Sequence, residues 1–272
     1  MSRLTPSQPD PPAGGQVTSS DNLSIQNLRM QFSGVVALDD VSFEVRAGEI
    51  FSLVGPNGSG KSTLFNCING FCSPQKGSIQ FHKVDLLNKK PHQIVKYGIS
   101  RTFQNLQNIP YMTLLDNILL GAHSRLTMRN TINRWISRKE REREEAFALE
   151  VMDFLGIANF EKKYLSGQPY GIQKLVEIAR ALICKPDLIL MDEPAAGMND
   201  QETLEIGKII SEIRDVLGIT VLVVEHDMNL VMNISDRICV LDSGKILALD
   251  TPDKVKNHPE VVKVFLGAEA HA

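Results

Sequence analysis

A glycine-rich run at residues 55–62 has the residue types and the spacing of a phosphate-binding loop. It reads Gly-Pro-Asn-Gly-Ser-Gly-Lys-Ser and matches the pattern G-x-x-x-x-G-K-S/T. Glycines let successive backbone N–H groups wrap a phosphate, and the positive end of the following helix adds to the attraction. Lys61 would place its charge on the β- and γ-phosphates, and the Ser62 hydroxyl is a hard oxygen ligand for Mg²⁺. The alternative is an ordinary glycine-rich turn. The predicted nucleotide-binding residues here are Gly55, Pro56, Asn57, Gly58, Ser59, Gly60, Lys61, Ser62 and Thr63.

Two adjacent acids follow an apolar run at residues 188–191. Ligands of open α/β sheets bind at the carboxyl ends of the strands, where these acids would lie. We expect Asp192 to hold Mg²⁺, directly or through water. Glu193 would orient and deprotonate the attacking water. Alone, the pair could equally be two acids that cap a strand end, but beside a phosphate loop the catalytic interpretation is favoured.

Two further polar residues come directly after predicted strands. His226 follows the apolar strand 219–224, so we expect it at the same sheet edge as Asp192, where it could donate a hydrogen bond to the γ-phosphate. Gln104 ends another short strand, and its amide could bind Mg²⁺ or the water. Neither residue would stand out without the phosphate loop.

The elements that position these residues form an alternating pattern. Ranges 23–32 and 36–45 are rich in β-formers and predict strands, and 49–54 predicts a short strand that runs into the phosphate loop. From residue 171 onward, amphipathic helices alternate with the continuously apolar strands 188–191, 219–224 and 237–241. Such strands predict a parallel sheet covered by helices on both faces. Thr251 before Pro252 predicts a capped helix start.

Composition indicates a folded protein of ordinary type. The 272 residues carry 29 Lys+Arg against 32 Asp+Glu, a net charge of −3, so nothing in the overall charge favours nucleic acid. We find no apolar run near the roughly 20 residues that span a bilayer, and no signal peptide. The four cysteines lack metal-ligand spacing and are interpreted as reduced, buried thiols.

The chain divides into a polar tail and one domain. Residues 1–22 contain almost nothing apolar and are predicted to be a disordered tail, before a domain at 23–272. A helical run at 114–126 leads to the long, charged segment 129–155. That segment is interpreted as a solvated helix face with i,i+4 ion pairs, and the alternative is a basic contact with a partner or with lipid headgroups.

From Leu23 to Gly267 the chain resembles the ATP-binding subunits of ABC transporters. Gln104 after Thr102-Phe103 is similar to the family's Q-loop, and the Glu193-Pro194 run is similar to its Walker B end and D-loop. His226 resembles the switch histidine, and Phe32 lies where the family stacks an aromatic ring on adenine. Residues 101–105, 193–197 and 234–237 are closest to the branch for high-affinity uptake of branched-chain amino acids.

The resemblance implies an α/β, RecA-like P-loop core with an N-terminal antiparallel β portion and an inserted α-helical subdomain at about 105–183. It implies Mg-dependent ATP hydrolysis at the cytoplasmic face of the inner (plasma) membrane. Partners would be transmembrane permease subunits, a second ABC ATPase subunit and, indirectly, an external solute-binding protein. Nucleic acid is not an expected partner. A heterodimer is favoured over a homodimer, because the signature of this chain departs from its usual form; the branch that the chain resembles uses two different ATPase subunits, which agrees.

The family signature departs from its usual form. The run 165–168 looks like a shortened signature, but counting back from the helix at 177–182 places the signature at 168–172 instead. The residues that would face ATP bound by the partner subunit are Pro169, Tyr170, Gly171 and Ile172. Proline replaces the usual serine and offers neither a hydroxyl nor an N–H to a phosphate. Asn199 likewise replaces the D-loop aspartate.

Two other functions use similar loops. A soluble ABC-type ATPase of translation or DNA repair would have two ATPase halves or a long coiled coil, and this chain has one half and a short helical insert. A small-molecule P-loop kinase would need neither the signature-like helix nor the Glu193-Pro194 run. The leading interpretation is therefore an ATPase subunit that powers a transporter, with amino acids as the cargo that the resemblance suggests.

Overall fold

The structure is a computed structural model that describes residues 21–102, 108–129 and 138–269. Most of the predicted tail, Gln104 and residues 130–137 of the charged segment 129–155 therefore lie outside the described residues. Within the described ranges, no helix is long and apolar enough to cross a membrane.

The N-terminal half contains two antiparallel strands, a short core strand and the first helix, as predicted. A four-stranded antiparallel sheet has the order β2-β1-β4-β5. Its register pairs Ile25 with Phe43 on one side and with Ile79 on the other. The elements are β1 (Asp21–Phe32), β2 (Val35–Arg46), β3 (Ile50–Val54), α1 (Lys61–Ile68), β4 (Lys76–Phe81), β5 (Val84–Asp85), α2 (Pro91–Ile94), η1 (Val95–Tyr97) and β6 (Ile99–Arg101).

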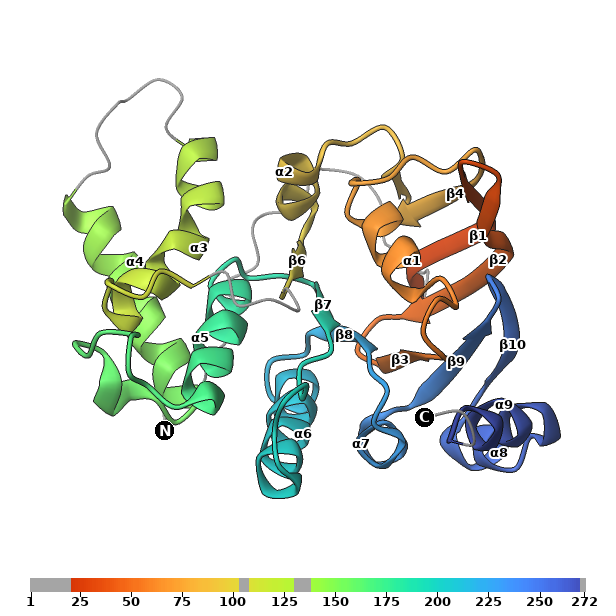
Figure 1. The fold of residues 1–272 in the computed structure, drawn as a ribbon. Coiled ribbons are helices and arrows are strands. Elements are labelled where there is room, and N and C mark those ends of the chain that lie inside the picture. The colour runs from red at the N-terminus through yellow and green to blue at the C-terminus, as the bar shows by residue number, and fades with distance from the viewer. Residues whose placement is uncertain (1–20, 103–107, 130–137, 270–272) are drawn as a thin grey trace.

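Three helices form a lobe at one end of the molecule, on the left in Figure 1. They are α3 (Leu114–Arg129), α4 (Arg138–Phe154) and α5 (Tyr170–Leu182), with η2 (Ala158–Phe160) between the last two. Buried side chains such as Ile118, Met152 and Ile178 join all three helices into one cluster, which continues onto the central sheet. The lobe is therefore packed against the core that carries the phosphate loop.

The C-terminal half alternates strands and helices, as the apolar runs predict. It contains β7 (Leu188–Asp192), α6 (Asp200–Asp215), β8 (Thr220–Val224), α7 (Met228–Ile234), β9 (Arg237–Asp242), β10 (Lys245–Asp250), α8 (Pro252–Lys256) and α9 (Pro259–Glu269). With β3 and β6 these strands form a six-stranded sheet of order β10-β9-β3-β8-β7-β6. Only the β9–β10 pair within it is antiparallel.

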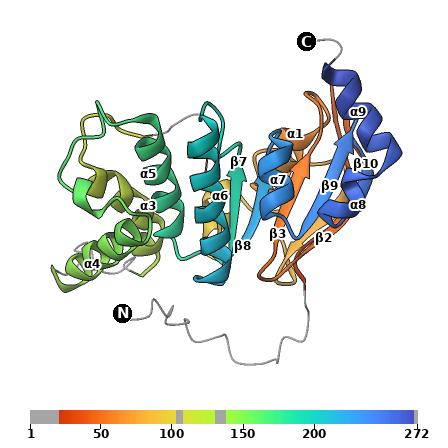
Figure 2. The same cartoon turned by 90° about the horizontal axis from the view of Figure 1, so that it is seen from below.

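Both faces of the six-stranded sheet are covered. Alternate residues of β7 point to opposite sides, so Ile189 and Met191 pack with α5 and α6, whereas Leu188 and Leu190 pack with α1 and the antiparallel sheet. Figure 2 shows α6 and α7 lying side by side over one face of the strands. This two-sided burial explains the continuously apolar strands and confirms the predicted α/β architecture.

One predicted helix cap is wrong. Thr251 does occupy the N-cap position of α8 and Pro252 follows it, but the threonine side chain makes no capping hydrogen bond. Instead, Thr251 donates its N–H to the Asp250 carboxylate, and its carbonyl accepts from the N–H groups of Lys254 and Val255. The local sequence predicted where the helix starts, but it did not predict that the threonine side chain leaves the first N–H groups of the helix uncapped.

The cysteines are free thiols. Cys67 and Cys239 are buried in the apolar core, and burial raises the pKa of each thiol to about 12. They are therefore protonated at neutral pH and pack as small apolar side chains, as the sequence predicted.

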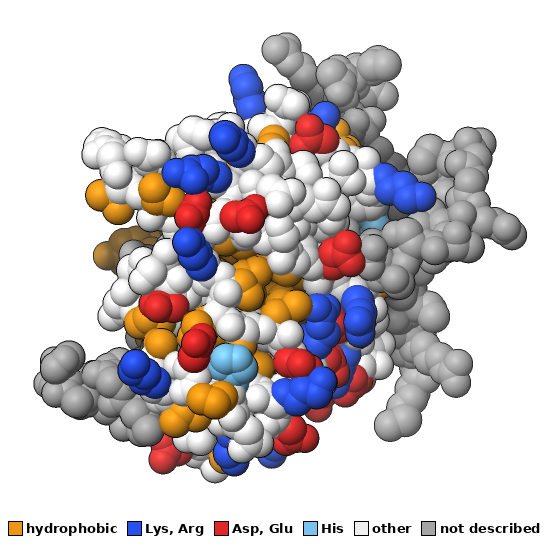
Figure 3. Space-filling view, turned by 90° about the vertical axis from the view of Figure 1, so that its right-hand side faces the viewer, with side chains coloured by type: hydrophobic (Ala, Val, Ile, Leu, Met, Phe, Trp, Pro, Cys, Tyr) orange, Lys and Arg blue, Asp and Glu red, His pale blue; other side chains and the backbone are white. Residues whose placement is uncertain are grey.

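Charges of both signs are mixed on the face that Figure 3 shows. Lys and Arg side chains lie among Asp and Glu, with small apolar groups between them. The described part of this face therefore lacks the continuous basic surface that is typical of nucleic-acid binding.

Candidate functional site

The strands bring the predicted site residues to one edge of the central sheet. Val224, the last residue of β8, pairs with Leu53 near the end of β3 and with Asp192 at the end of β7. The phosphate loop follows β3, Glu193 follows β7 and His226 lies two residues after β8. The parallel register therefore gathers the phosphate loop, both acids and the histidine.

Close backbone packing explains two of the three glycines of the phosphate loop. A Cβ on Gly55 would lie 2.1 Å from the carbonyl oxygen of Leu241 on β9. Gly60 has φ +107°, and a Cβ there would lie 2.5 Å from the carbonyl oxygen of Ala37 on β2. Larger residues at either position would push the loop away from the strands that support it.

Lys61 begins α1, and its ammonium group turns back over the loop. Nζ donates to the carbonyl oxygens of Gly55 at 2.7 Å and Pro56 at 2.9 Å. Burial lowers the pKa of Lys61, while the carboxylates of Glu193 and Asp192 raise it. The lysine charge thus lies at the centre of the loop and within electrostatic reach of both predicted acids.

The two acids take different environments although they are adjacent. Asp192 is almost buried, and its Oδ2 accepts from an Arg101 guanidinium nitrogen at 2.7 Å. Glu193 adopts φ +48°, a left-handed conformation that costs a non-glycine residue on the order of 1 kcal/mol. Its N–H donates to the carbonyl of Val224 at 2.9 Å, which ties the turn after β7 to β8. Strain of this kind persists where the surrounding structure enforces it, which is common at active sites.

Arg101 is a site residue that sequence reasoning did not assign. It ends β6, and besides Asp192 it donates to the side-chain oxygen of Asn66 on α1 at 3.0 Å. Its partners are distant in the chain, so no local pattern could have revealed the bridge. Arg101 therefore fixes the orientation of Asp192 relative to the helix that follows the phosphate loop.

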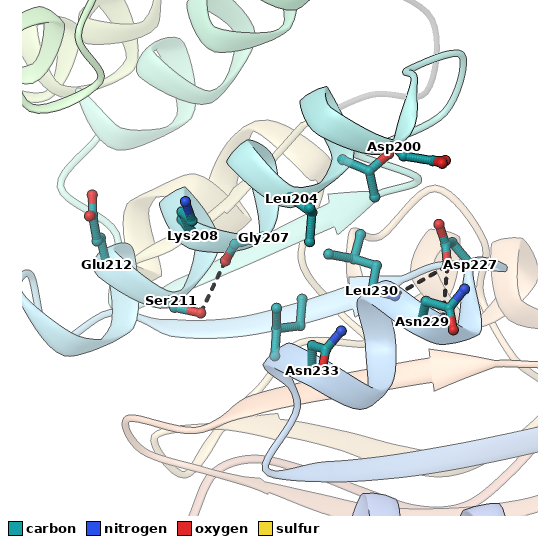
Figure 4. Close-up of a pocket in the computed structure, with 12 residues that line it drawn as sticks. Asp200, Leu204, Gly207, Lys208, Ser211, Glu212, Asp227, Asn229, Leu230 and Asn233 are labelled. Atoms are coloured by element: carbon teal, nitrogen blue, oxygen red, sulfur yellow. Dashed lines mark hydrogen bonds between the residues drawn. The ribbon is translucent and has the colours of Figure 1, made fainter.

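His226 lies between two acids, Glu225 and Asp227, to which the sequence analysis assigned no role. The histidine side chain is 64% exposed, in the loop that follows β8. Glu225 before it is buried, and its Oε2 accepts from the His226 N–H at 3.1 Å. Asp227 after it caps α7 by accepting from the N–H groups of Asn229 and Leu230, as Figure 4 shows.

The predicted signature residues lie at the start of α5. Pro169 is the N-cap residue of that helix and supplies no side-chain hydrogen bond. Ile172 packs against the apolar core, and the Tyr170 ring lies near Gly197 in the turn after β7. The look-alike run 165–168 lies in a turn before the helix.

Two other predicted positions have clear local surroundings. Phe32 is 45% exposed at the end of β1, which leaves its ring available for stacking. Asn199 accepts from the N–H of Glu202, whose carboxylate accepts from the N–H of Asn199, in a complete capping box for α6. Asparagine can therefore cap α6 as the usual aspartate would at this position.

The remaining predicted site residue, Gln104, lies outside the described residues.

A groove of about 500 Å³ runs between α6 and α7 (Figure 4). It is lined by residues such as Leu204, Gly207 and Leu230, and none of the phosphate-loop residues belongs to it. Gly207 lies where α6 and α7 approach closely, since a Cβ there would lie 2.8 Å from Leu230 Cδ1. The groove is thus distinct from the predicted nucleotide site.

Two oxygen-bearing side chains near the phosphate loop have the chemistry of Mg²⁺ ligands, and Mg²⁺ is the ion that usually accompanies bound nucleotide phosphates. The Ser62 hydroxyl and the Asp192 carboxylate are hard oxygen ligands, which Mg²⁺ prefers over nitrogen or sulfur. They lie at the first turn of α1 and at the end of β7, on the same sheet edge. The residues present therefore fit Mg²⁺.

Comparison with known proteins finds relatives along most of the chain. A family model described as "ABC transporter" matches residues 38–196. The high-affinity branched-chain amino acid transport ATP-binding protein LivG of Salmonella typhimurium is 38% identical over 249 residues, covering 90% of this chain and 97% of LivG. BraF of Pseudomonas aeruginosa, which bears the same description, is 36% identical over 249 residues, again 90% of this chain and 97% of the relative.

Solved structures agree with the sequence relatives. The ADP conformation of an ATP-binding cassette of an ABC transporter superposes with a TM-score of 0.81 at 34% identity, covering 92% of this chain and all of the cassette. A nucleotide-free cassette superposes with a TM-score of 0.78 at 34% identity, covering 90% and 98% of the two chains.

Proposed function

Because the chain belongs to the ABC transporter family, as an ATP-hydrolysing subunit of a transporter, we propose that it drives the uptake of branched-chain or related amino acids from the cytoplasmic face of the inner membrane. The observation that carries the assignment is the single sheet edge that joins a phosphate loop to Asp192, Glu193 and His226. The names of LivG and BraF support the cargo. They do not favour the alternative of a translation or repair ATPase.

In the proposed function, each of these side chains has its own role in binding or hydrolysing ATP. Lys61 and the loop N–H groups bind the phosphates, and the exposed Phe32 ring stacks on adenine. Glu193 accepts a proton from the attacking water, and His226 donates a hydrogen bond to the γ-phosphate. Ser62 and Asp192, with Gln104, would hold Mg²⁺, which supplies charge stabilisation to the phosphates when bound.

The working unit is proposed to be an asymmetric pair of ATPase subunits. In an ATP sandwich, each nucleotide lies between the phosphate loop of one chain and the signature of the other. This chain has a complete phosphate loop and base, but Pro169 places neither a hydroxyl nor an N–H at the start of α5. A partner with the usual serine would complete the site built on Lys61 and Glu193. The alternative is that Gly171 and the positive end of α5 suffice.

We expect the double variant Pro169→Ser, Ile172→Gln to leave transport unchanged, because the site that this signature closes is not the productive one. The measurement is uptake by the assembled transporter, with the thermal midpoint as a check, since Ile172 packs on the core. A gain in transport would mean that the weakened signature limits turnover. Cooperative ATP hydrolysis by this chain alone, at the rate of the assembled transporter, would contradict the heterodimer.

The membrane subunits are proposed to contact the loop before α3. Tyr111 is 85% exposed there, and Ile109 and Tyr164 beside it are also exposed. The loop is firmly held, since Asn117 is buried, donates to the carbonyls of Ile109 and Thr113, and accepts from the Ile109 N–H. An exposed aromatic side chain on a well-held loop is typical of an interface anchor.

Tyr111→Ala should therefore weaken binding of the membrane subunits by roughly tenfold or more, the usual effect of removing an aromatic anchor. Co-purification of the membrane subunits with a tagged chain measures this, and ATP affinity should not change. Val216→Ala, another exposed apolar residue at the far end of α6, is the matched control. Equal recovery of the membrane subunits with both variants would exclude this surface.

A further inference from the structure

Glu225 is a buried carboxylate that none of the roles above uses. It lies between β8 and His226, and the residue is 1% exposed. Both oxygens accept hydrogen bonds from backbone N–H groups: Oε1 from Ala195 at 2.9 Å and Oε2 from His226 at 3.1 Å. The carboxylate therefore joins the turn after β7 to the loop after β8.

Such a group is costly unless it is fully hydrogen-bonded. Burial raises the pKa of Glu225, and the hydrogen bonds from the N–H groups of Ala195 and His226 offset only part of that rise. An apolar residue would avoid the cost of burying a charge, but it would leave the buried Ala195 N–H and the partly buried His226 N–H without this acceptor. The carboxylate is thus matched to these two particular loops.

The turn that Glu225 holds contains the strained base. Glu193 has φ +48°, its carbonyl accepts from the Ala196 N–H at 3.2 Å, and its own N–H is tied to Val224. The Ala195 N–H, held by Glu225, anchors the turn on the side beyond Glu193. Without that anchor, Glu193 could relax toward an ordinary backbone conformation while β7 stayed in place.

The hydrogen bond from the His226 N–H to Glu225 Oε2 holds the backbone on the N-terminal side of the histidine. Asp227 already fixes the chain after His226 by capping α7 (Figure 4), so the backbone of His226 is held on both sides. Because one carboxylate serves both loops, a movement of one loop is transmitted to the other.

We propose that Glu225 is a positioning residue that holds the turn of Glu193 and the loop of His226 in one arrangement, so that base and histidine reach the γ-phosphate together. This inference rests on the proposed function of that site. Glu225 contacts none of the phosphate-loop residues in its hydrogen bonds, so its effect belongs to the catalytic step and not to nucleotide binding.

The test is Glu225→Gln in the assembled transporter, with ATPase kinetics and binding of a fluorescent ATP analogue as readouts. The amide keeps one acceptor but turns an NH₂ group toward the other backbone N–H, so one bond to a charged group is lost. We expect kcat to fall about tenfold or more, with KM and nucleotide affinity within twofold of wild type. Glu212→Gln, an exposed carboxylate on α6, is the matched control and should change nothing.

A second variant separates position from charge. Glu225→Asp keeps the charge but is one methylene shorter, so it cannot reach both N–H groups, and kcat should fall here too. Wild-type kcat in either variant overturns the proposal. So does a loss of activity that matches a fall in nucleotide affinity and in the thermal midpoint, because that pattern indicates a merely structural role. If the wild-type transporter itself lacks ATPase activity, the proposed function fails instead.

Discussion

Glu193→Gln is expected to bind ATP but to hydrolyse it roughly 10²–10⁴ times more slowly than wild type, the usual effect of losing a general base. Glutamine has the shape of glutamate and can adopt the same backbone, but it cannot accept the proton of the attacking water. The Lys61 ammonium and the phosphate loop are untouched, so nucleotide affinity should remain. The closed dimer should then accumulate with ATP bound.

ATPase rate and nucleotide affinity of the assembled transporter measure both halves of this prediction. Glu212→Gln on the exposed face of α6 controls for the loss of a carboxylate elsewhere. Hydrolysis by Glu193→Gln within a factor of two of wild type would mean that another residue is the base.

Lys61→Ala should raise the Kd for ATP by about 30-fold or more, because removing one partner of a buried charge pair costs about 2 kcal/mol or more. The ammonium lies over the loop, held by the carbonyls of Gly55 and Pro56, where a bound phosphate would meet it. Titration with a fluorescent ATP analogue gives the Kd, and the thermal midpoint confirms that the variant is folded.

Lys208→Ala, an exposed lysine on α6, is the matched control and should leave the Kd unchanged. A Kd for Lys61→Ala within threefold of wild type would show that the loop N–H groups alone bind the phosphates.

The sequence predicted those parts of the fold that have a strong local pattern. Strands β3, β7, β8 and β9 are largely apolar because they are buried on both faces, and two glycines of the phosphate loop, Gly55 and Gly60, are needed for close backbone packing. The strands β4, β5 and β10 were not predicted. They are short or mixed in character, and β4 is a strand because it pairs with β1, some fifty residues earlier in the chain.

Side-chain bridges between distant segments could not be predicted either. Arg101 and Asp192 lie 91 residues apart, and Ala195 and Glu225 lie 30 apart. Such pairs exist only once the strand register brings the sheet edge together. The prediction at Thr251 failed in a different way. The residue pattern placed the start of α8 correctly, but the threonine side chain does not make the expected capping hydrogen bond.

The claim that this chain powers amino-acid uptake is tested most directly by uptake of radiolabelled leucine into cells that lack its gene. We expect uptake at low leucine concentration to be lost, restored by the wild-type chain and not restored by Glu193→Gln. Unchanged uptake in the deletion strain, or full restoration by Glu193→Gln, would contradict the account.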